Sequence, residues 1–245
     1  MSITTAEDTR QRFIDRLGSE FGDYFFHLDQ SVIGLVSLWD VYRSLFGTNK
    51  ERVDLLNQAS GYVTRTIQDS LHERIVLGIC QVSDPYVSKG RRNVTVSGLP
   101  EFVTAPEHRA AMLPMIDAVR ASTSFARDLR SKMIAHADLE AVTGSYAVDY
   151  STRERIVAAI RSVIVPLRYV HFQYFEATQL YHAIHPLPNA VGFLRCIYLG
   201  VAKVEERKKA LKLGPRDMWF PAWLDEAERN EFDSEFHLPK GGGPL

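Results

Sequence analysis

Residues 49–85 read NKERVDLLNQASGYVTRTIQDSLHERIVLGICQVSDP, and a regular apolar pattern runs through almost all of this stretch. Asn49 is a residue type that caps helix starts well, and Asp84-Pro85 stops a helix firmly. Between them, apolar residues recur at steps of three, four or seven, which place them on one face of an α-helix. They are Val53, Leu56, Val63, Ile67, Leu71, Ile75 and Ile79. The pattern predicts one long helix over residues 49–83.

The same periodicity predicts further helices on both sides of this stretch. They are expected over residues 4–18, 23–47, 104–133, 151–184 and 189–212, and Pro166 is expected to kink the fourth of these. Glycine, arginine and proline break the pattern over 86–104, where residues 93–96 form an expected extended piece. The fold class is therefore all-α, a bundle of long helices with a C-terminal helical extension. We expect an N-terminal helix over 1–22, the bundle over 23–186, and a C-terminal helix and tail over 187–245.

Composition narrows the class of protein. The chain has 245 residues, of which 45% are hydrophobic and 24% charged, with a formal net charge of −1. The near-neutral charge gives no global sign of nucleic-acid binding, although a local basic patch would suffice. The start of the chain is polar and acidic, and no apolar run reaches the length of a membrane helix, so we expect a cytoplasmic protein. Cys80 and Cys196 are far apart in apolar helical contexts and are expected to be buried free thiols.

A cluster of charged side chains ends the helix expected over 104–133. Arg130 and His136 are six positions apart, so on a straight helix they lie about 120° apart around the axis. They converge only if the helix ends or bends there, or if a second subunit supplies the partner. Asp128, Lys132 and His136 do share one face. One interpretation is a solvated helix end, where cations suit the dipole. The other is chemical, since a guanidinium stabilises phosphoryl oxyanions and an imidazole titrates near neutrality.

Residues 130–136, Arg-Ser-Lys-Met-Ile-Ala-His, resemble the R-x(4-6)-H signature of HEPN domains in its R-x-K-x-x-A-H form. The helical layout over about 25–185 is similar to the AbiU branch of that family, named for abortive phage infection. The resemblance implies a homodimeric all-α domain that acts as a metal-independent endoribonuclease without a cofactor, in phage defence or with an antitoxin. The resemblance also implies that Arg130 stabilises the scissile phosphate and that His136 serves as acid or base. Ser131, Lys132 and Asp138 are then the expected supporting residues.

Two positions depart from the family's pattern. Ser131 stands where the family usually has Asn, Asp or His, and this weakens an orienting hydrogen bond. Asp138 stands where toxins regulated by nucleotidyltransferase antitoxins often carry Tyr, so that route of regulation is not supported. Two alternatives to the nuclease therefore stay open. One is a non-catalytic HEPN-like module that binds RNA or a protein partner, and the other is a helical interaction protein whose charged helix end is structural.

Basic residues outside the motif are candidates for phosphate contacts. Lys89, Arg91 and Arg92 cluster in the loop after the long helix, and Arg127 lies one turn before Arg130. We expect these four residues to contact RNA, although a solvated loop explains the first three about equally well. His171, His182 and His185 lie close in sequence to Tyr174 but lack a matching carboxylate pair at metal-ligand spacing. We therefore expect an aromatic core with histidines at its edge and no metal site.

Overall fold

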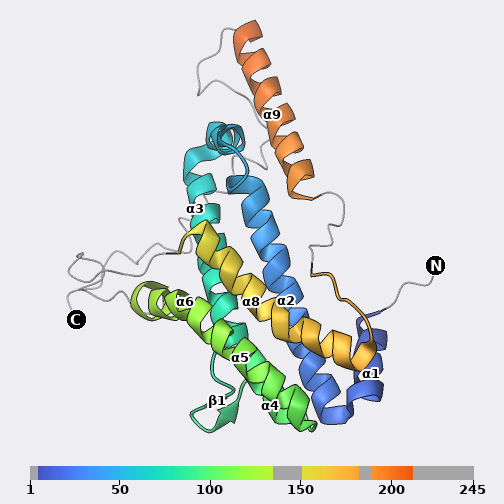
Figure 1. The fold of residues 1–245 in the computed structure, drawn as a ribbon. Coiled ribbons are helices and arrows are strands. Elements are labelled where there is room, and N and C mark those ends of the chain that lie inside the picture. The colour runs from blue at the N-terminus through green and yellow to red at the C-terminus, as the bar shows by residue number, and fades with distance from the viewer. Residues whose placement is uncertain (1–4, 135–150, 182–188, 212–245) are drawn as a thin grey trace, which may run out of the picture. The chain divides into compact units, whose positions relative to one another are not determined.

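The computed structural model describes residues 5–134, 151–181 and 189–211, and the prediction of an all-α bundle is confirmed (Figure 1). The chain divides into two units, residues 1–194 and 195–245, and the first contains the bundle. The helices are α1 (Ala6–Leu17), α2 (Ser19–Phe46), α3 (Lys50–Ser83), η1 (Val96–Gly98), α4 (Leu99–Phe102), α5 (Pro106–Ser122), α6 (Ser124–Leu129), η2 (Arg130–Ile134), α8 (Arg153–Phe175) and α9 (Ala190–Leu211). A short hairpin joins β1 (Val87–Ser88) to β2 (Arg91–Arg92).

The hydrophobic core of the bundle is built from one face of each long helix. α2 packs against α1 and α3, and α5 packs against α8, which also contacts α2 and α3. Fully buried side chains come from all of these helices: Phe13, Phe25, Leu28, Ile75, Ile79, Met112 and Leu167. The long elements therefore place the end of α3 beside α6 and η2, where the charged sequence begins.

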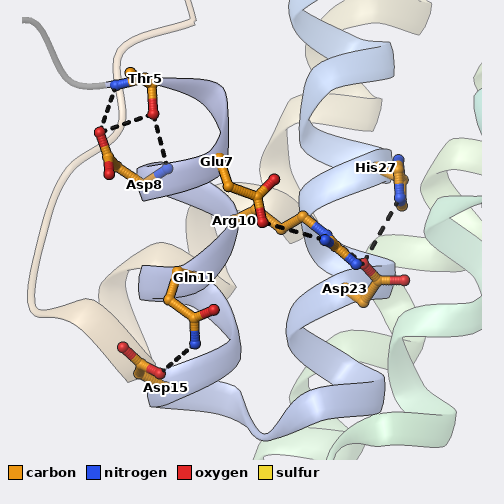
Figure 2. A network of polar contacts seen from close by, with 8 residues as sticks. All are labelled: Thr5, Glu7, Asp8, Arg10, Gln11, Asp15, Asp23 and His27. Atoms are coloured by element: carbon orange, nitrogen blue, oxygen red, sulfur yellow. Dashed lines mark hydrogen bonds and ion pairs between the residues drawn. The ribbon is translucent and has the colours of Figure 1, made fainter.

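The first helical hairpin depends on a close approach of two backbones. Thr5 caps α1 through a reciprocal pair of hydrogen bonds with Asp8 (Figure 2), and Gly18, at φ +86°, makes the turn into α2. A Cβ atom added at Gly22 in α2 would lie 2.5 Å from the Ile14 Cα atom in α1. Only a residue without a side chain lets the two helices pack at this separation.

Gly22→Ala is expected to lower the free energy of unfolding by about 1–3 kcal/mol, because α1 must move away from α2. Gly34 in the same helix is a matched control, since a Cβ atom there meets nothing within 4 Å. Gly34→Ala is expected to raise the free energy of unfolding by about 0.4–1 kcal/mol, because alanine lowers the conformational entropy of the unfolded chain. Urea titration of both variants checks the pair, and equal effects of the two substitutions would contradict the close packing.

The long helix over 49–83 is confirmed in extent but was wrongly expected to be uninterrupted. Ser60 has non-helical angles (φ −166°, ψ 107°), and α3 is kinked there. The Ser60 hydroxyl accepts a hydrogen bond from Val63 N at 3.4 Å, as an N-cap does. Thr64 Oγ1 donates to Leu56 O at 2.9 Å across the break. Serine followed by glycine was the available sequence signal for this second helix start.

The helix expected over 104–133 is also interrupted. It divides at Thr123, whose angles (φ −103°, ψ 2°) leave the helical region between α5 and α6. The Thr123 hydroxyl donates to the Val119 carbonyl at 2.8 Å, so the side chain competes for a backbone acceptor of the helix. The run Ser122-Thr123-Ser124 explains the division, because short hydroxyl side chains favour such local bonds.

Three other expected boundaries were wrong. α2 begins at Ser19, directly after Gly18, and not at residue 23. α8 continues through Pro166 but ends at Phe175, well before residue 184, because Glu176 takes the left-handed conformation. Residues 93–96 form no strand, because the Tyr24 hydroxyl, not a neighbouring strand, binds the backbone N–H and C=O of Thr95. The absence of a strand at residues 93–96 follows from a contact with a distant part of the chain, which a local pattern does not contain. The last helix, expected over 189–212, is confirmed as α9, with Asn189 capping its first turn.

The burial of His72 in α3 is expected to make the stability of the bundle depend on pH. Its ring contacts Ser151 Oγ at 2.5 Å, and burial lowers the pKa of the imidazole below its usual 6.5. Below the unfolded-state pKa the unfolded chain binds the proton more readily, so the free energy of unfolding falls as the pH falls through 6.5. We expect His72→Gln to flatten this fall between about pH 7 and pH 5. Urea midpoints measured across this range check it, and a fall as steep as that of wild type would contradict it.

Candidate functional site

The charged stretch of the motif lies where regular helix geometry changes. α6 passes at Arg130 into η2, a π-helical turn over Arg130–Ile134. Single π turns inside helices are rare and are frequent at functional sites. His136 and Asp138 lie outside the described residues, so their proposed roles stay predictions. The described part of the site consists of Arg130, Ser131, Lys132 and their neighbours.

Arg130 is held by an acidic side chain at the end of α3. Its Nη1 atom lies 2.6 Å from Asp84 Oδ2, and the two side chains are 34% and 25% exposed. Burial lowers the pKa of Arg130, but the hydrogen bond to Asp84 and the negative charge nearby outweigh it, so the pKa is raised. The guanidinium is therefore permanently charged and held by Asp84, and 34% of the Arg130 side chain is exposed to solvent.

Asp84 has an unusual hydrogen-bonding state. Its Oδ1 atom is buried, and it has no hydrogen-bond partner among the described residues. An unsatisfied carboxylate oxygen is destabilising, so Asp84 depends on Arg130 for compensation. The sequence identified Asp84 only as a helix stop, and no signal in it showed the pairing with Arg130 across 46 positions.

Arg127 also binds the end of α3. We call this part of the bundle, where Arg127 and Arg130 meet Ser83 and Asp84, the Arg130 corner. Its guanidinium donates to Thr123 Oγ1 at 2.9 Å, to Arg120 O at 2.8 Å and, more weakly, to Ser83 Oγ at 3.5 Å. Arg127 and Arg130 thus contact consecutive residues, Ser83 and Asp84, at the end of α3. The structure brings these two predicted site residues together, with Arg127 bonded to protein groups that fix its position.

Lys132 and Asp128 occupy one helix face, as their spacing predicts. Lys132 Nζ lies 3.5 Å from Asp128 Oδ1, and each side chain is 26% exposed. Ser131, between Arg130 and Lys132, is exposed to solvent. The two predicted supporting residues that the structure describes, Ser131 and Lys132, therefore follow Arg130 along one short turn.

Cys80 lies in the same corner but does not act as a nucleophile. It is buried, and burial raises the pKa of its thiol to about 11. The positive charges of Arg130 and Arg127 lower this pKa, but by less than burial raises it. The thiol therefore stays protonated at neutral pH, whereas the reactive form of a cysteine is the thiolate. Cys80 and Cys196 are both free, as expected, but Cys196 is exposed, so its expected burial was wrong. The apolar residues around Cys196 in the sequence do not show whether it lies on the buried or the exposed side of its helix.

The basic loop forms an exposed hairpin that follows directly from Asp84. Lys89 and Gly90 both have positive φ angles (50° and 73°), as a two-residue type I′ turn requires. Lys89, Arg91 and Arg92 are all exposed. Arg92 lies 2.7 Å from Glu20, whereas the structure describes no contact between these hairpin residues and Arg130. The cations of the hairpin are thus exposed to solvent, and that of Arg92 is paired with Glu20.

His171, considered as a metal ligand, belongs to the core rather than to its edge. It is 3% exposed, lies 3.3 Å from Asp29 Oδ1, and packs against the rings of Phe13, Phe25 and Phe175. The described residues contain no group of three His, Cys, Asp or Glu side chains placed to hold a metal ion. His182 and His185 lie outside the described residues.

Comparison with known proteins supports the family resemblance. The model of a HEPN family described as AbiU2 matches residues 18–186, which is most of the chain. No curated protein and no solved structure matches. None of the helices in the described ranges is long and apolar enough to cross a membrane.

Proposed function

Because this chain belongs to the AbiU2 family of HEPN proteins, which is related to abortive infection, we propose that it is a metal-independent endoribonuclease. We assign it to phage defence or to a toxin–antitoxin system. The observation that carries the proposal is Arg130, the first residue of the family motif. It stands on a π-helical turn, its charge is fixed by Asp84, and a third of its side chain remains exposed. RNA is the proposed substrate, and a second copy of the chain and an antitoxin are the proposed protein partners.

In the proposed reaction the RNA supplies its own nucleophile. The 2′-oxygen attacks the adjacent phosphorus, the bond to the 5′-oxygen breaks, and the products are a 2′,3′-cyclic phosphate and a 5′-hydroxyl. Arg130 stabilises the extra negative charge on the phosphoryl oxygens, for which a permanently charged planar fork is well suited. His136 transfers a proton as acid or base. Lys132, Ser131 and Asp138 support this pair, and dimerisation brings two such pairs together.

The experiment is cleavage of total RNA by purified protein in EDTA. We expect fragments with 2′,3′-cyclic phosphate ends, because no step requires a metal ion. Activity that disappears in EDTA and returns with a divalent cation would overturn the metal-independent mechanism. Intact RNA under all conditions would overturn the nuclease itself.

A second candidate is a non-catalytic module that binds RNA or a protein partner. It is favoured by Ser131, which replaces the Asn, Asp or His usual in the family, and by the ion pair that already occupies Arg130. RNA binding by gel shift without any cleavage product would support this candidate over the first.

Asp84 is proposed as a positioning residue for Arg130. Asp84→Asn keeps the size of the side chain but removes the charge that holds the guanidinium 2.6 Å away. We expect kcat to fall about 10- to 100-fold, because misplacing a catalytic group by about 1 Å has effects of this size. KM should not rise, because Arg130 without its ion pair to Asp84 can still bind the phosphate of the substrate. Asp84→Glu should restore part of kcat, and a rise in KM at constant kcat would contradict positioning.

A further inference from the structure

A hollow of about 230 Å³ lies beside the hairpin, outside the Arg130 corner. Three segments line it: the start of α2, the hairpin with its flanking residues, and α4. Its principal side chains are Glu20, Asp23, Tyr24, Tyr86, Arg92 and Phe102. The volume is below the roughly 300 Å³ at which pockets for drug-sized ligands begin, so it suits one small planar group.

Aromatic rings form the apolar part of the hollow. The Tyr24 and Phe102 ring centroids are 4.5 Å apart, and Tyr86 stands nearly perpendicular to both at 6.0 and 6.2 Å. Tyr24 is fixed, because its hydroxyl donates to Thr95 O at 2.5 Å and accepts from Thr95 N at 2.9 Å. Burial raises the pKa of Tyr24 to about 12, so this hydroxyl stays protonated. The Tyr24 ring is therefore held in place, and Tyr86 is partly exposed to an incoming group.

The carboxylates of Glu20 and Asp23, the guanidinium of Arg92 and the imidazole of His27 form the polar rim. Arg92 pairs with Glu20 at 2.7 Å and reaches the Tyr86 hydroxyl at 3.4 Å. The contacts that the structure describes for Asp23, with Arg10 at 2.7 Å and His27 at 3.7 Å, all fall on its Oδ1 atom. Figure 2 shows the other oxygen of Asp23 pointing away from Arg10. The rim thus presents hydrogen-bond acceptors beside an aromatic surface, with a cation at its edge.

We propose that this hollow binds a single unstacked base of single-stranded RNA, and that it prefers a base with an exocyclic amino group. Stacking on an aromatic ring holds bases of any kind, and carboxylates accept hydrogen bonds from the amino groups of adenine and cytosine. Uracil has no exocyclic amino group and offers only its ring N3–H as a donor. The proposal rests on the proposed function in one respect, that the polymer is RNA.

The chain connects the hollow to the Arg130 corner. Tyr86 is two residues beyond Asp84, so their Cα atoms are at most about 7 Å apart. Asn93 Nδ2 donates to Pro85 O at 2.9 Å and ties the far side of the hairpin to this connection. We expect a short RNA segment with one base in the hollow to direct its phosphates toward the end of α3, where Asp84 binds Arg130. The hollow would then select which nucleotide stands next to the cleaved bond.

The test is a titration of full-length protein against a short 2′-O-methyl RNA carrying one 2-aminopurine, in EDTA. The methyl group removes the nucleophile, so binding is measured without cleavage. Stacking quenches the fluorescence of 2-aminopurine, and we expect quenching with wild type. Tyr86→Leu should weaken binding about 5- to 100-fold, the range for loss of one stacked base, whereas Tyr86→Phe should stay within about twofold. Absence of quenching with wild type overturns the proposal whether or not any variant folds.

Base preference gives a second, independent readout. Among 2′-O-methyl oligomers of equal length, we expect oligo(A) and oligo(C) to bind at least about 5-fold tighter than oligo(U). Glu20→Ala combined with Asp23→Ala should remove this preference. Equal binding of all three by wild type overturns the base preference. Quenching without cleavage of ordinary RNA would contradict the proposed nuclease activity but support base binding in the hollow. Cleavage without quenching would support the nuclease activity but contradict base binding in the hollow.

Discussion

Arg130→Ala is expected to lower the rate of RNA cleavage by about 10²- to 10³-fold, and His136→Ala by about 10²- to 10⁴-fold. The first value is typical for loss of one preorganised group that stabilises charge in the transition state. The second is typical for loss of a positioned acid or base. Rates of release of 2′,3′-cyclic phosphate ends from a defined RNA, measured in EDTA, check both variants.

The two substitutions should differ in kind. Arg130→Lys keeps the charge but not the planar fork, so it should recover only part of the activity. His136→Ala should remove the limb of the pH–rate profile that reports the imidazole, while Arg130→Ala should keep that limb at a lower rate. A profile of unchanged shape in His136→Ala would assign the proton transfer to another group.

Arg120→Ala is the matched control for loss of an arginine in this region. Arg120 is exposed, and its side chain pairs at the surface, 3.2 Å from Asp117. Such pairs contribute about 0–1 kcal/mol, and the backbone carbonyl that Arg127 uses remains in place. Cleavage by this variant should stay within about twofold of wild type. Equal losses in Arg120→Ala and Arg130→Ala would mean that the effect is general electrostatics rather than catalysis.

The sequence was sufficient for the parts of this fold that are local. Asn49 and Asp84-Pro85 mark the ends of α3, and helical periodicity alone predicts the bundle. The family motif also marks Arg130 as a candidate site residue from the sequence alone, because the motif is read from neighbouring residues. Contacts between distant segments are different in kind, since no local pattern contains them. Asp84 and Arg130 meet only because α3 and η2 pack together.

The end of α8 illustrates the same limit. Apolar periodicity continues past Phe175, yet Glu176 turns the chain out of the helix. After the turn, the Tyr181 hydroxyl donates to the buried Asp29 at 2.5 Å, across 152 positions. A hydrogen bond to an ionised carboxylate is about twice as strong as one between neutral groups. We infer that this contact with Asp29 in α2 favours the end of the helix at Phe175, and no local pattern around residue 176 contains it.

Asp29→Ala is therefore expected to lower the free energy of unfolding by about 3–5 kcal/mol. Asp29 is 3% exposed and accepts a hydrogen bond from Tyr181, and His171 Nε2 lies 3.3 Å from the same oxygen. Burial and the charge of Asp29 raise the pKa of Tyr181, so its hydroxyl stays protonated as a donor. Alanine would leave the imidazole and the phenol buried without their acceptor. Guanidinium titration, with the slope compared to wild type, gives the value.

Two further variants separate the lost acceptor from lost packing. Asp29→Asn keeps the shape and one acceptor oxygen, so it should lower the free energy of unfolding by less than half as much as Asp29→Ala. In a Tyr181→Phe background, Asp29→Ala should be less destabilising by about 0.5–3 kcal/mol, because one of the stranded donors is already absent. Additive effects would mean that Tyr181 and Asp29 do not act together. In that case the hydrogen bond would not explain why α8 ends at Phe175, and the cause would have to lie in the packing of the Phe175 ring against Phe13 and His171.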